Sequence, residues 1–186
     1  MAKNVIIGQS GGPTAVINSS LAGVYKAACS LGADKVYGMQ YGIEGLLKEE
    51  MVELNVLFGD RMSIELLKRT PSSYLGSCRY KLPDPEADPA PFIKLFTLFD
   101  KYDICALFYI GGNDSMDTIA KLSRYGAKVG SSVRFIGVPK TIDNDLCLTD
   151  HTPGYGSAAK YIATILKEVI RDSSVYNIRS VTVAEI

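Results

Sequence analysis

The chain has 186 residues, of which 47% are hydrophobic and 22% are charged, the composition of an ordinary globular protein. Lysine and arginine together number 20, as do aspartate and glutamate, so the formal net charge at pH 7 is zero. A balanced charge argues against a nucleic-acid-binding protein, which needs a basic face to neutralise phosphates. It does not exclude a small phosphate ligand held by a few placed donors.

The cysteines do not form a metal-binding or redox motif. They are widely spaced, contain no CxxC pair and accompany one histidine, which disfavours zinc: Cys29, Cys78, Cys105 and Cys147. We expect all four to be reduced thiols in a cytoplasmic protein. Apolar runs are too short for a signal peptide or a membrane span, so no membrane association is expected.

Hydrophobic periodicity predicts strands and helices in alternation. The β-branched run at 4–8 predicts a first strand, and apolar residues at helical spacing predict a helix over 13–32. The rest of the expected order is a strand at 35–42, a helix at 60–71, a proline-rich loop at 82–91, an amphipathic helix at 92–102, a strand at 103–112, a helix at 114–126, a strand at 133–139, a helix at 157–174 and a strand at 180–186.

This alternation favours an α/β fold of the Rossmann-like, doubly wound kind, with a mainly parallel sheet and helices on both faces. Ligands of such sheets bind beyond the carboxyl ends of the strands. Three loops of unusual composition are expected there: GQSGGPT (8–14), GGNDSMDT (111–118) and PKTIDND (139–145). We therefore predict a binding site built from these loops.

The first loop has the composition of a phosphate cradle. Gly11 and Gly12 lack a Cβ, so their backbone N–H groups can approach an anion, and the next helix points its positive end the same way. The loop matches neither GxxxxGK[ST] nor GxGxxG. A tight strand-to-helix turn is the alternative interpretation.

The second loop combines glycines with oxygen-bearing side chains. Gly112 is followed by Asn113 and Asp114, and Mg²⁺ prefers oxygen ligands together with water and substrate phosphates. The alternative is a helix N-cap at Asp114, with Asp117 in the first turn.

The third loop contains the side chains best suited to catalysis. Asp143 and Asp145 are two residues apart, so in an extended segment both would face one pocket, with Thr141 on the same side. One carboxylate can take a proton from a hydroxyl and another can hold Mg²⁺, while Lys140 can stabilise phosphate oxygens. The alternatives are Asx-turn capping for the aspartates and a solvated surface lysine.

These residues resemble the phosphofructokinase family. GGPTAVIN, GGND and PKTIDND are similar to its first glycine loop, its phosphoryl-site loop and its catalytic loop, and YLGSCR (74–79) and TPGYGSAA (152–159) match two further segments. Order and spacing agree over nearly the whole chain.

The resemblance implies the pyrophosphate-dependent branch of that family. ATP-dependent members typically have GGDGS and PGTIDND, whereas Asp114 and Lys140 here replace a glycine in each motif. A carboxylate at 114 would fill and repel the place of a nucleotide α-phosphate, and a lysine at 140 would add charge for pyrophosphate. At position 113 this chain has Asn where many relatives have an aspartate that contacts Mg²⁺. Because Asn offers only a neutral oxygen, more of the Mg²⁺ coordination would fall to Asp114, Asp145 or pyrophosphate.

The resemblance also implies roles for individual residues. Asp143 would accept the proton of the 1-hydroxyl of fructose 6-phosphate, with Lys140 and Asp114 completing the catalytic set. The substrate-binding residues would be Thr141, Ile142 and Asp143, the donor-binding residues Gly11, Gly12, Arg79 and Gly112, and the Mg²⁺ ligands Asn113 and Asp145.

By the same resemblance, residues 1–186 would form an N-terminal phosphoryl-donor-binding domain, with a sugar-phosphate domain beyond 186. Such a fragment should be nearly inactive alone, and the full-length protein should form a homo-oligomer. Two alternatives stay open: an ATP-dependent 6-phosphofructokinase and a non-catalytic regulatory module that binds phosphate esters. A dinucleotide-binding dehydrogenase is disfavoured because GxGxxG is missing.

Overall fold

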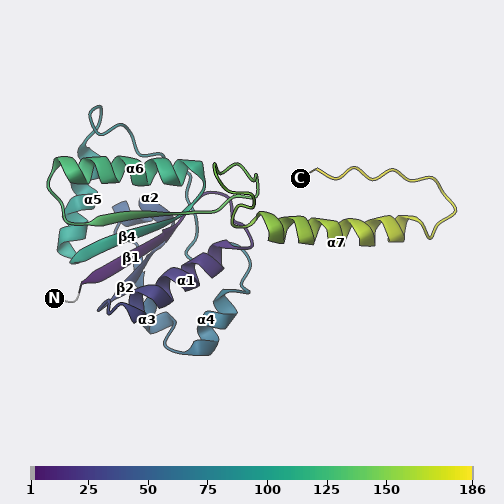
Figure 1. The fold of residues 1–186 in the computed structure, drawn as a ribbon, viewed down its shortest axis with the longest axis horizontal. Helices are drawn as coiled ribbons and strands as arrows, with labels where there is room; N and C mark the ends of the chain where they lie inside the picture. The colour runs from purple at the N-terminus through teal and green to yellow at the C-terminus, as the bar shows by residue number, and fades with distance from the viewer. Residues whose placement is uncertain (1–2, 186) are drawn as a thin grey trace.

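The structure, a computed structural model, describes residues 3–185 and is built on one five-stranded sheet of order β3-β2-β1-β4-β5 (Figure 1). The pairs β1–β2, β1–β4 and β4–β5 are parallel, and β2–β3 is antiparallel. The strands are β1 (Asn4–Gln9), β2 (Val36–Met39), β3 (Met51–Glu53), β4 (Ile104–Gly111) and β5 (Arg134–Pro139). The predicted mainly parallel α/β sheet is therefore confirmed.

Helices cover both faces of the sheet, as predicted (Figure 1). Alternate residues of β1 point to opposite faces: Val5 and Ile7 belong to the core beneath α1, and Ile6 to the core beneath α5 and α6. The helices are α1 (Ile17–Ser30), α2 (Gly42–Leu47), α3 (Leu54–Leu57), α4 (Arg61–Leu67), α5 (Ala90–Lys101), α6 (Asn113–Lys128) and α7 (Tyr155–Ser173).

Most expected elements are present, with corrections at their ends. The helix expected from 13 begins at Ile17, because residues 13–16 form the turn in which Ile17 N donates to the Thr14 carbonyl at 3.2 Å. The helix expected over 60–71 ends at Leu67, and Asp60 caps its start by accepting from Ser63 N at 2.8 Å. Three short elements were not predicted: α2, β3 and α3.

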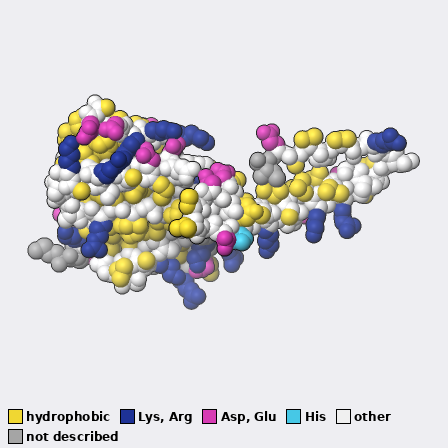
Figure 2. Space-filling view, turned by 45° about the horizontal axis from the view of Figure 1, so that its top comes forward, with side chains coloured by type: hydrophobic (Ala, Val, Ile, Leu, Met, Phe, Trp, Pro, Cys, Tyr) yellow, Lys and Arg dark blue, Asp and Glu magenta, His cyan; other side chains and the backbone are white. Residues whose placement is uncertain are grey.

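The end of the chain differs most from expectation. Helix α7 projects away from the sheet, and none of its described residues is buried (Figure 1). The strand expected over 180–186 is wrong for 180–185, since those residues have no strand partner among residues 3–185; Ile186 lies outside the described residues. Figure 2 shows hydrophobic side chains along this projecting arm.

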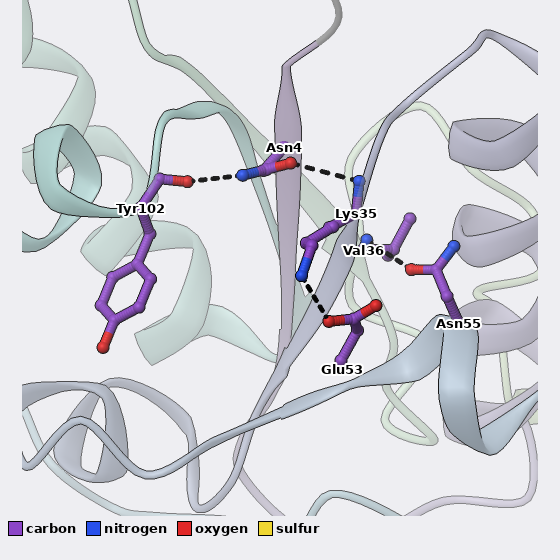
Figure 3. A network of polar contacts seen from close by, with 6 residues as sticks. All are labelled: Asn4, Lys35, Val36, Glu53, Asn55 and Tyr102. Carbon is purple, nitrogen blue, oxygen red and sulfur yellow. Dashed lines mark hydrogen bonds and ion pairs between the residues drawn. The ribbon is translucent and has the colours of Figure 1, made fainter.

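A polar network at the amino end of the sheet fixes the position of β1 (Figure 3). Asn4 Nδ2 donates to the Tyr102 carbonyl at 2.8 Å, and Asn4 Oδ1 accepts from Lys35 N at 3.2 Å. Lys35 Nζ then pairs with Glu53 Oε2 at 2.9 Å. These contacts fix the amino ends of the strands relative to one another. The carboxyl ends of the same strands, where the loops of the predicted site begin, are therefore held in fixed positions too.

No helix within residues 3–185 is both long enough and apolar enough to cross a membrane.

Candidate active site

The three loops singled out in the sequence meet in one cleft at the carboxyl edge of the sheet. The cleft lies where β1 has β2 on one side and β4 on the other, the switch point at which doubly wound sheets bind ligands. Its volume is about 630 Å³. Its walls come from the loops after β1, β4 and β5 and from the segment 78–81.

The first glycine loop lines the cleft with bare backbone. Gly11 has φ +78°, the left-handed region that favours glycine, and its N–H donates to the Cys78 carbonyl at 3.3 Å. Ser77 Oγ donates to the Gly11 carbonyl at 2.5 Å. A Cβ added at Gly12 would meet no heavy atom of the described chain within 4 Å, so this residue faces open space. The loop is thus a tight turn and also an open backbone surface for an anion.

The second loop places the start of α6 at the cleft. Gly112 is the N-cap residue, and no described side chain caps the helix there. The alternative interpretation of Asp114 as the N-cap of this helix is therefore wrong. Its carboxylate instead forms an ion pair with Lys81, with 3.1 Å between Oδ1 and Nζ. The positive end of the α6 dipole and the backbone N–H groups of its first turn favour a bound anion at this position.

Lys140 is a buried cation in the cleft wall. The residue is 5% exposed, and its Nζ donates to the carbonyl of Gly12. Burial lowers the pKa of Lys140; the Asp143 carboxylate opposes this shift and the Arg79 guanidinium adds to it. The interpretation of Lys140 as a solvated surface lysine is wrong.

The catalytic-loop segment brings Asp143 to the cleft but turns Asp145 aside. Asn144 adopts φ 54°, so the backbone is not extended between Asp143 and Asp145 and these two residues do not share a face. The expectation that Asp143 and Asp145 face one pocket is therefore wrong: Asp143 lines the cleft and Asp145 does not. Asp145 Oδ2 instead accepts from Asn113 Nδ2 at 3.2 Å, at the rim.

Hydrogen bonds from Asn144 and Thr152 hold this loop in shape. Asn144 Oδ1 accepts from Thr152 N at 3.0 Å, and Asn144 Nδ2 donates to the Asp150 carbonyl at 3.2 Å. Thr152 Oγ1 donates to the Thr141 carbonyl at 2.9 Å. The side chain of Asp143 is exposed beside these anchors, free to meet a ligand.

All the predicted site residues except Asp145 line the cleft: Gly11, Gly12, Arg79, Gly112, Asn113, Asp114, Lys140, Thr141, Ile142 and Asp143. Sequence reasoning missed several others, among them Ser10 and Ser115, whose buried hydroxyls contact each other and join the first two loops. It also missed Lys81, although that residue lies only two positions beyond Arg79.

Asn113 and Asp145 at the rim are the two side chains predicted to hold a magnesium ion. Within residues 3–185 no group of three or more His, Cys, Asp or Glu side chains could hold a metal. The Asn113 amide and the Asp145 carboxylate do lie side by side, 3.2 Å apart. Mg²⁺ typically uses one or two protein oxygens together with waters and phosphates, so the side-chain oxygens of Asn113 and Asp145 would supply only the protein share of such a site.

Fold and cleft together define a doubly wound α/β protein with a cleft of glycine loops and charged side chains at its strand ends. The sequence profile of the family described as phosphofructokinase matches residues 4–186. The chain belongs to the phosphofructokinase family.

Two curated relatives have the same printed name. The chain is 44% identical over 172 residues to the pyrophosphate–fructose 6-phosphate 1-phosphotransferase of Halomonas elongata, covering 91% of this chain and 40% of the relative. It is 42% identical over 173 residues to that of Methylococcus capsulatus, covering 92% and 41%. The chain thus spans about two fifths of the length of these relatives.

A solved structure has the same fold. The pyrophosphate-dependent phosphofructokinase of Nitrosospira multiformis superposes with a TM-score of 0.84 at 41% identity, over 94% of this chain and 43% of that one. Its match confirms the α/β architecture.

Proposed function

We propose that the protein transfers a phosphoryl group from pyrophosphate to the 1-hydroxyl of fructose 6-phosphate, giving fructose 1,6-bisphosphate. The observation that supports this most is the buried ammonium of Lys140 against the Gly12 carbonyl, in the wall of a cleft lined by two glycine loops. A buried cation is costly unless an anion compensates it. Pyrophosphate is a compact anion of the right charge.

The chain's own residues supply the donor site. The backbone of Gly12 and Gly112 and the N-terminus of α6 offer N–H donors to phosphate oxygens, while Gly11 shapes the turn that presents them. Arg79 and Lys140, which both line the cleft, offset the charge of pyrophosphate. Together these groups stabilise the charge that develops on the transferred phosphoryl group.

Asp143 is the proton acceptor in this proposal. The 1-hydroxyl oxygen forms a new bond to one phosphorus of pyrophosphate, and the bond from that phosphorus to the bridging oxygen breaks. Inorganic phosphate leaves with the bridging oxygen, and the hydroxyl proton passes to the Asp143 carboxylate. Thr141 and Ile142, next to Asp143 in the cleft, contact the sugar.

Asn113 and Asp145 would hold Mg²⁺ in this reaction, together with phosphate oxygens. When bound, the ion supplies positive charge to the phosphate groups. The amide of Asn113 contributes a neutral oxygen only, so Asp145 is the one charged protein ligand of this pair.

Asp114 and Lys140 set the choice of donor in this proposal. The Asp114 carboxylate at the start of α6 repels a further phosphate, as ATP would bring, while Lys140 adds the positive charge that pyrophosphate needs. An ATP-dependent 6-phosphofructokinase is the alternative within the family, and it predicts turnover with ATP.

The remaining proposals concern the whole protein. We infer that residues 1–186 form its phosphoryl-donor-binding domain, that sugar-phosphate contacts come from further residues, and that the full-length enzyme is a homo-oligomer. We place it in the cytoplasm, where the four free thiols suit a reducing environment.

Asp143→Asn in the full-length protein separates an enzyme from a regulatory phosphate-binding module. The substitution removes the proton acceptor, so turnover should fall by about 10²–10⁴-fold while pyrophosphate still binds. Asp150→Asn is the control, because that exposed residue uses only its backbone carbonyl in the loop. Unchanged turnover in Asp143→Asn would contradict the catalytic role.

A further inference from the structure

Lys81 is a third cation on the cleft besides Arg79 and Lys140. Its ammonium lies 3.1 Å from the Asp114 carboxylate, so the ion pair joins the segment 78–81 to the start of α6. The two side chains of this pair are 73% and 72% exposed. Neither residue has a second ion pair among those seen in residues 3–185.

The backbone on both sides of Lys81 is fixed. The Cys78 carbonyl accepts from Gly11 N at 3.3 Å, and the Leu82 carbonyl accepts from Lys121 Nζ at 2.8 Å. Leu82 itself is 2% exposed and belongs to the core. The side chain of Lys81 is therefore carried to the cleft by a held segment but is itself free to change partner.

The ion pair contributes little to folding. Pairs between two exposed side chains are screened by water and lose side-chain entropy, so they add little stability. An ammonium has three donors, and one bond to Asp114 leaves two for other acceptors. Because Lys81 lines the cleft, an anion bound there can accept hydrogen bonds from these two donors.

We propose that Lys81 binds the phosphate group of pyrophosphate that leaves, and that Asp114 positions it there. This inference rests on the proposed function, in which Asp114 stands where a longer polyphosphate would continue. Lys81 neutralises the carboxylate that would otherwise repel pyrophosphate as well as ATP. Donor choice then depends on a pair of residues. The Asp114 carboxylate blocks the additional phosphate of ATP, and Lys81 offsets the negative charge of Asp114 so that pyrophosphate can bind.

The test is steady-state kinetics in both directions with the full-length enzyme and its Lys81→Met variant. We expect the KM for pyrophosphate, and the KM for phosphate in the reverse reaction, to rise about tenfold, as for the loss of a charged hydrogen bond. The KM values for fructose 6-phosphate and fructose 1,6-bisphosphate should stay unchanged. Lys81→Arg, which keeps the charge, should retain most of the affinity.

Lys128→Met is the matched control, since Lys128 is also an exposed lysine of an ion pair, with Glu86, but lies outside the cleft. Asp114→Asn added to Lys81→Met should recover part of the lost pyrophosphate affinity, because the unpaired carboxylate is removed. Calorimetric titration with pyrophosphate and thermal denaturation of each variant separate binding from folding.

A KM for pyrophosphate within twofold of wild type in Lys81→Met, with a wild type that uses pyrophosphate, would overturn the role of Lys81 and leave the proposed function standing. A wild type that makes no fructose 1,6-bisphosphate from pyrophosphate would overturn the proposed function and this inference with it.

Discussion

The ammonium of Lys140 donates a hydrogen bond to the backbone carbonyl of Gly12, a residue 128 positions earlier in the chain. This contact joins the loop after β5 to the loop after β1 in the wall of the cleft. It also holds a positive charge in a residue that is only 5% exposed. The cleft is thus built around a cation whose burial is costly until an anion binds.

Replacing this cation should separate function from stability. In Lys140→Met we expect kcat/KM for pyrophosphate to fall by about 10²–10³-fold, because the phosphoryl group loses a charged donor. The thermal denaturation midpoint should not fall, since a buried charge is replaced by an apolar chain of similar length. Steady-state kinetics and denaturation of the same preparation check both. Undiminished pyrophosphate turnover would contradict the role of Lys140.

The lowered pKa of Lys140 predicts the alkaline limb of activity. The ammonium should be lost below the ordinary lysine pKa of 10.5, so kcat/KM for pyrophosphate should decline at a lower pH than a surface lysine would give. Between the lowered pKa and 10.5 the unfolded chain binds more protons, so the free energy of unfolding gains a positive slope with pH from this residue. Comparing pH profiles of activity and unfolding for wild type and Lys140→Met tests this: the unfolding free energy of the variant should lack that positive slope.

Much of this fold could be predicted because its elements have clear periodicity. The strands β1 and β4 are largely buried and β5 is half-buried, and all three are mainly apolar runs that end at glycine-containing or polar loops. Their alternation with helices implies a parallel sheet. The elements α2, β3 and α3 are too short for a periodic signal. Helix α7 was predicted as a helix, but its packing was not, since an apolar face does not say which surface covers it.

The candidate site was predictable where local sequence determines geometry. Glycines at strand ends indicate the cradle, and all three loops do meet there. The position of Asp145 was not predictable, because it depends on the left-handed backbone of Asn144. Lys81 was missed because its role follows from a contact with Asp114, 33 residues on, that no local pattern reveals.

The two glycines of the first loop should respond differently to alanine. Gly11 has φ +78°, so Gly11→Ala should cost about 1–2 kcal/mol of stability through backbone strain. Gly12→Ala should leave stability unchanged but raise the KM for pyrophosphate, since its methyl group would enter the open cleft. Denaturation and kinetics of both variants check this.

Gly32→Ala is the control, because Gly32 has φ +81° and lies outside the cleft. It should lose stability as Gly11→Ala does, with no change in the KM for pyrophosphate. Equal KM values for Gly12→Ala and wild type would contradict a backbone cradle at this loop.

The anchor of the catalytic loop should affect turnover more than donor binding. Asn144→Gly keeps the left-handed backbone but removes both side-chain hydrogen bonds, to Thr152 and Asp150. We expect kcat to fall about tenfold to a hundredfold as Asp143 loses its orientation, with little change in the KM for pyrophosphate. Asn144→Ala adds backbone strain and should be the less stable of the two. A normal kcat in both variants would show that these bonds do not orient Asp143.

Donor choice should follow Asp114 and Lys140. The double substitution Asp114→Gly with Lys140→Gly removes the blocking carboxylate and the extra cation, so we expect turnover with ATP to appear and turnover with pyrophosphate to fall. Rates with each donor, measured at equal Mg²⁺, report the change. An enzyme that still uses only pyrophosphate after both substitutions would place donor choice elsewhere.

The most direct test of the account is to measure fructose 1,6-bisphosphate formation by the full-length wild-type protein with pyrophosphate and with ATP, side by side. Turnover with pyrophosphate and not with ATP is the predicted result, since Asp114 and Lys140 line the same cleft. Turnover with ATP alone would contradict the roles assigned to these two residues.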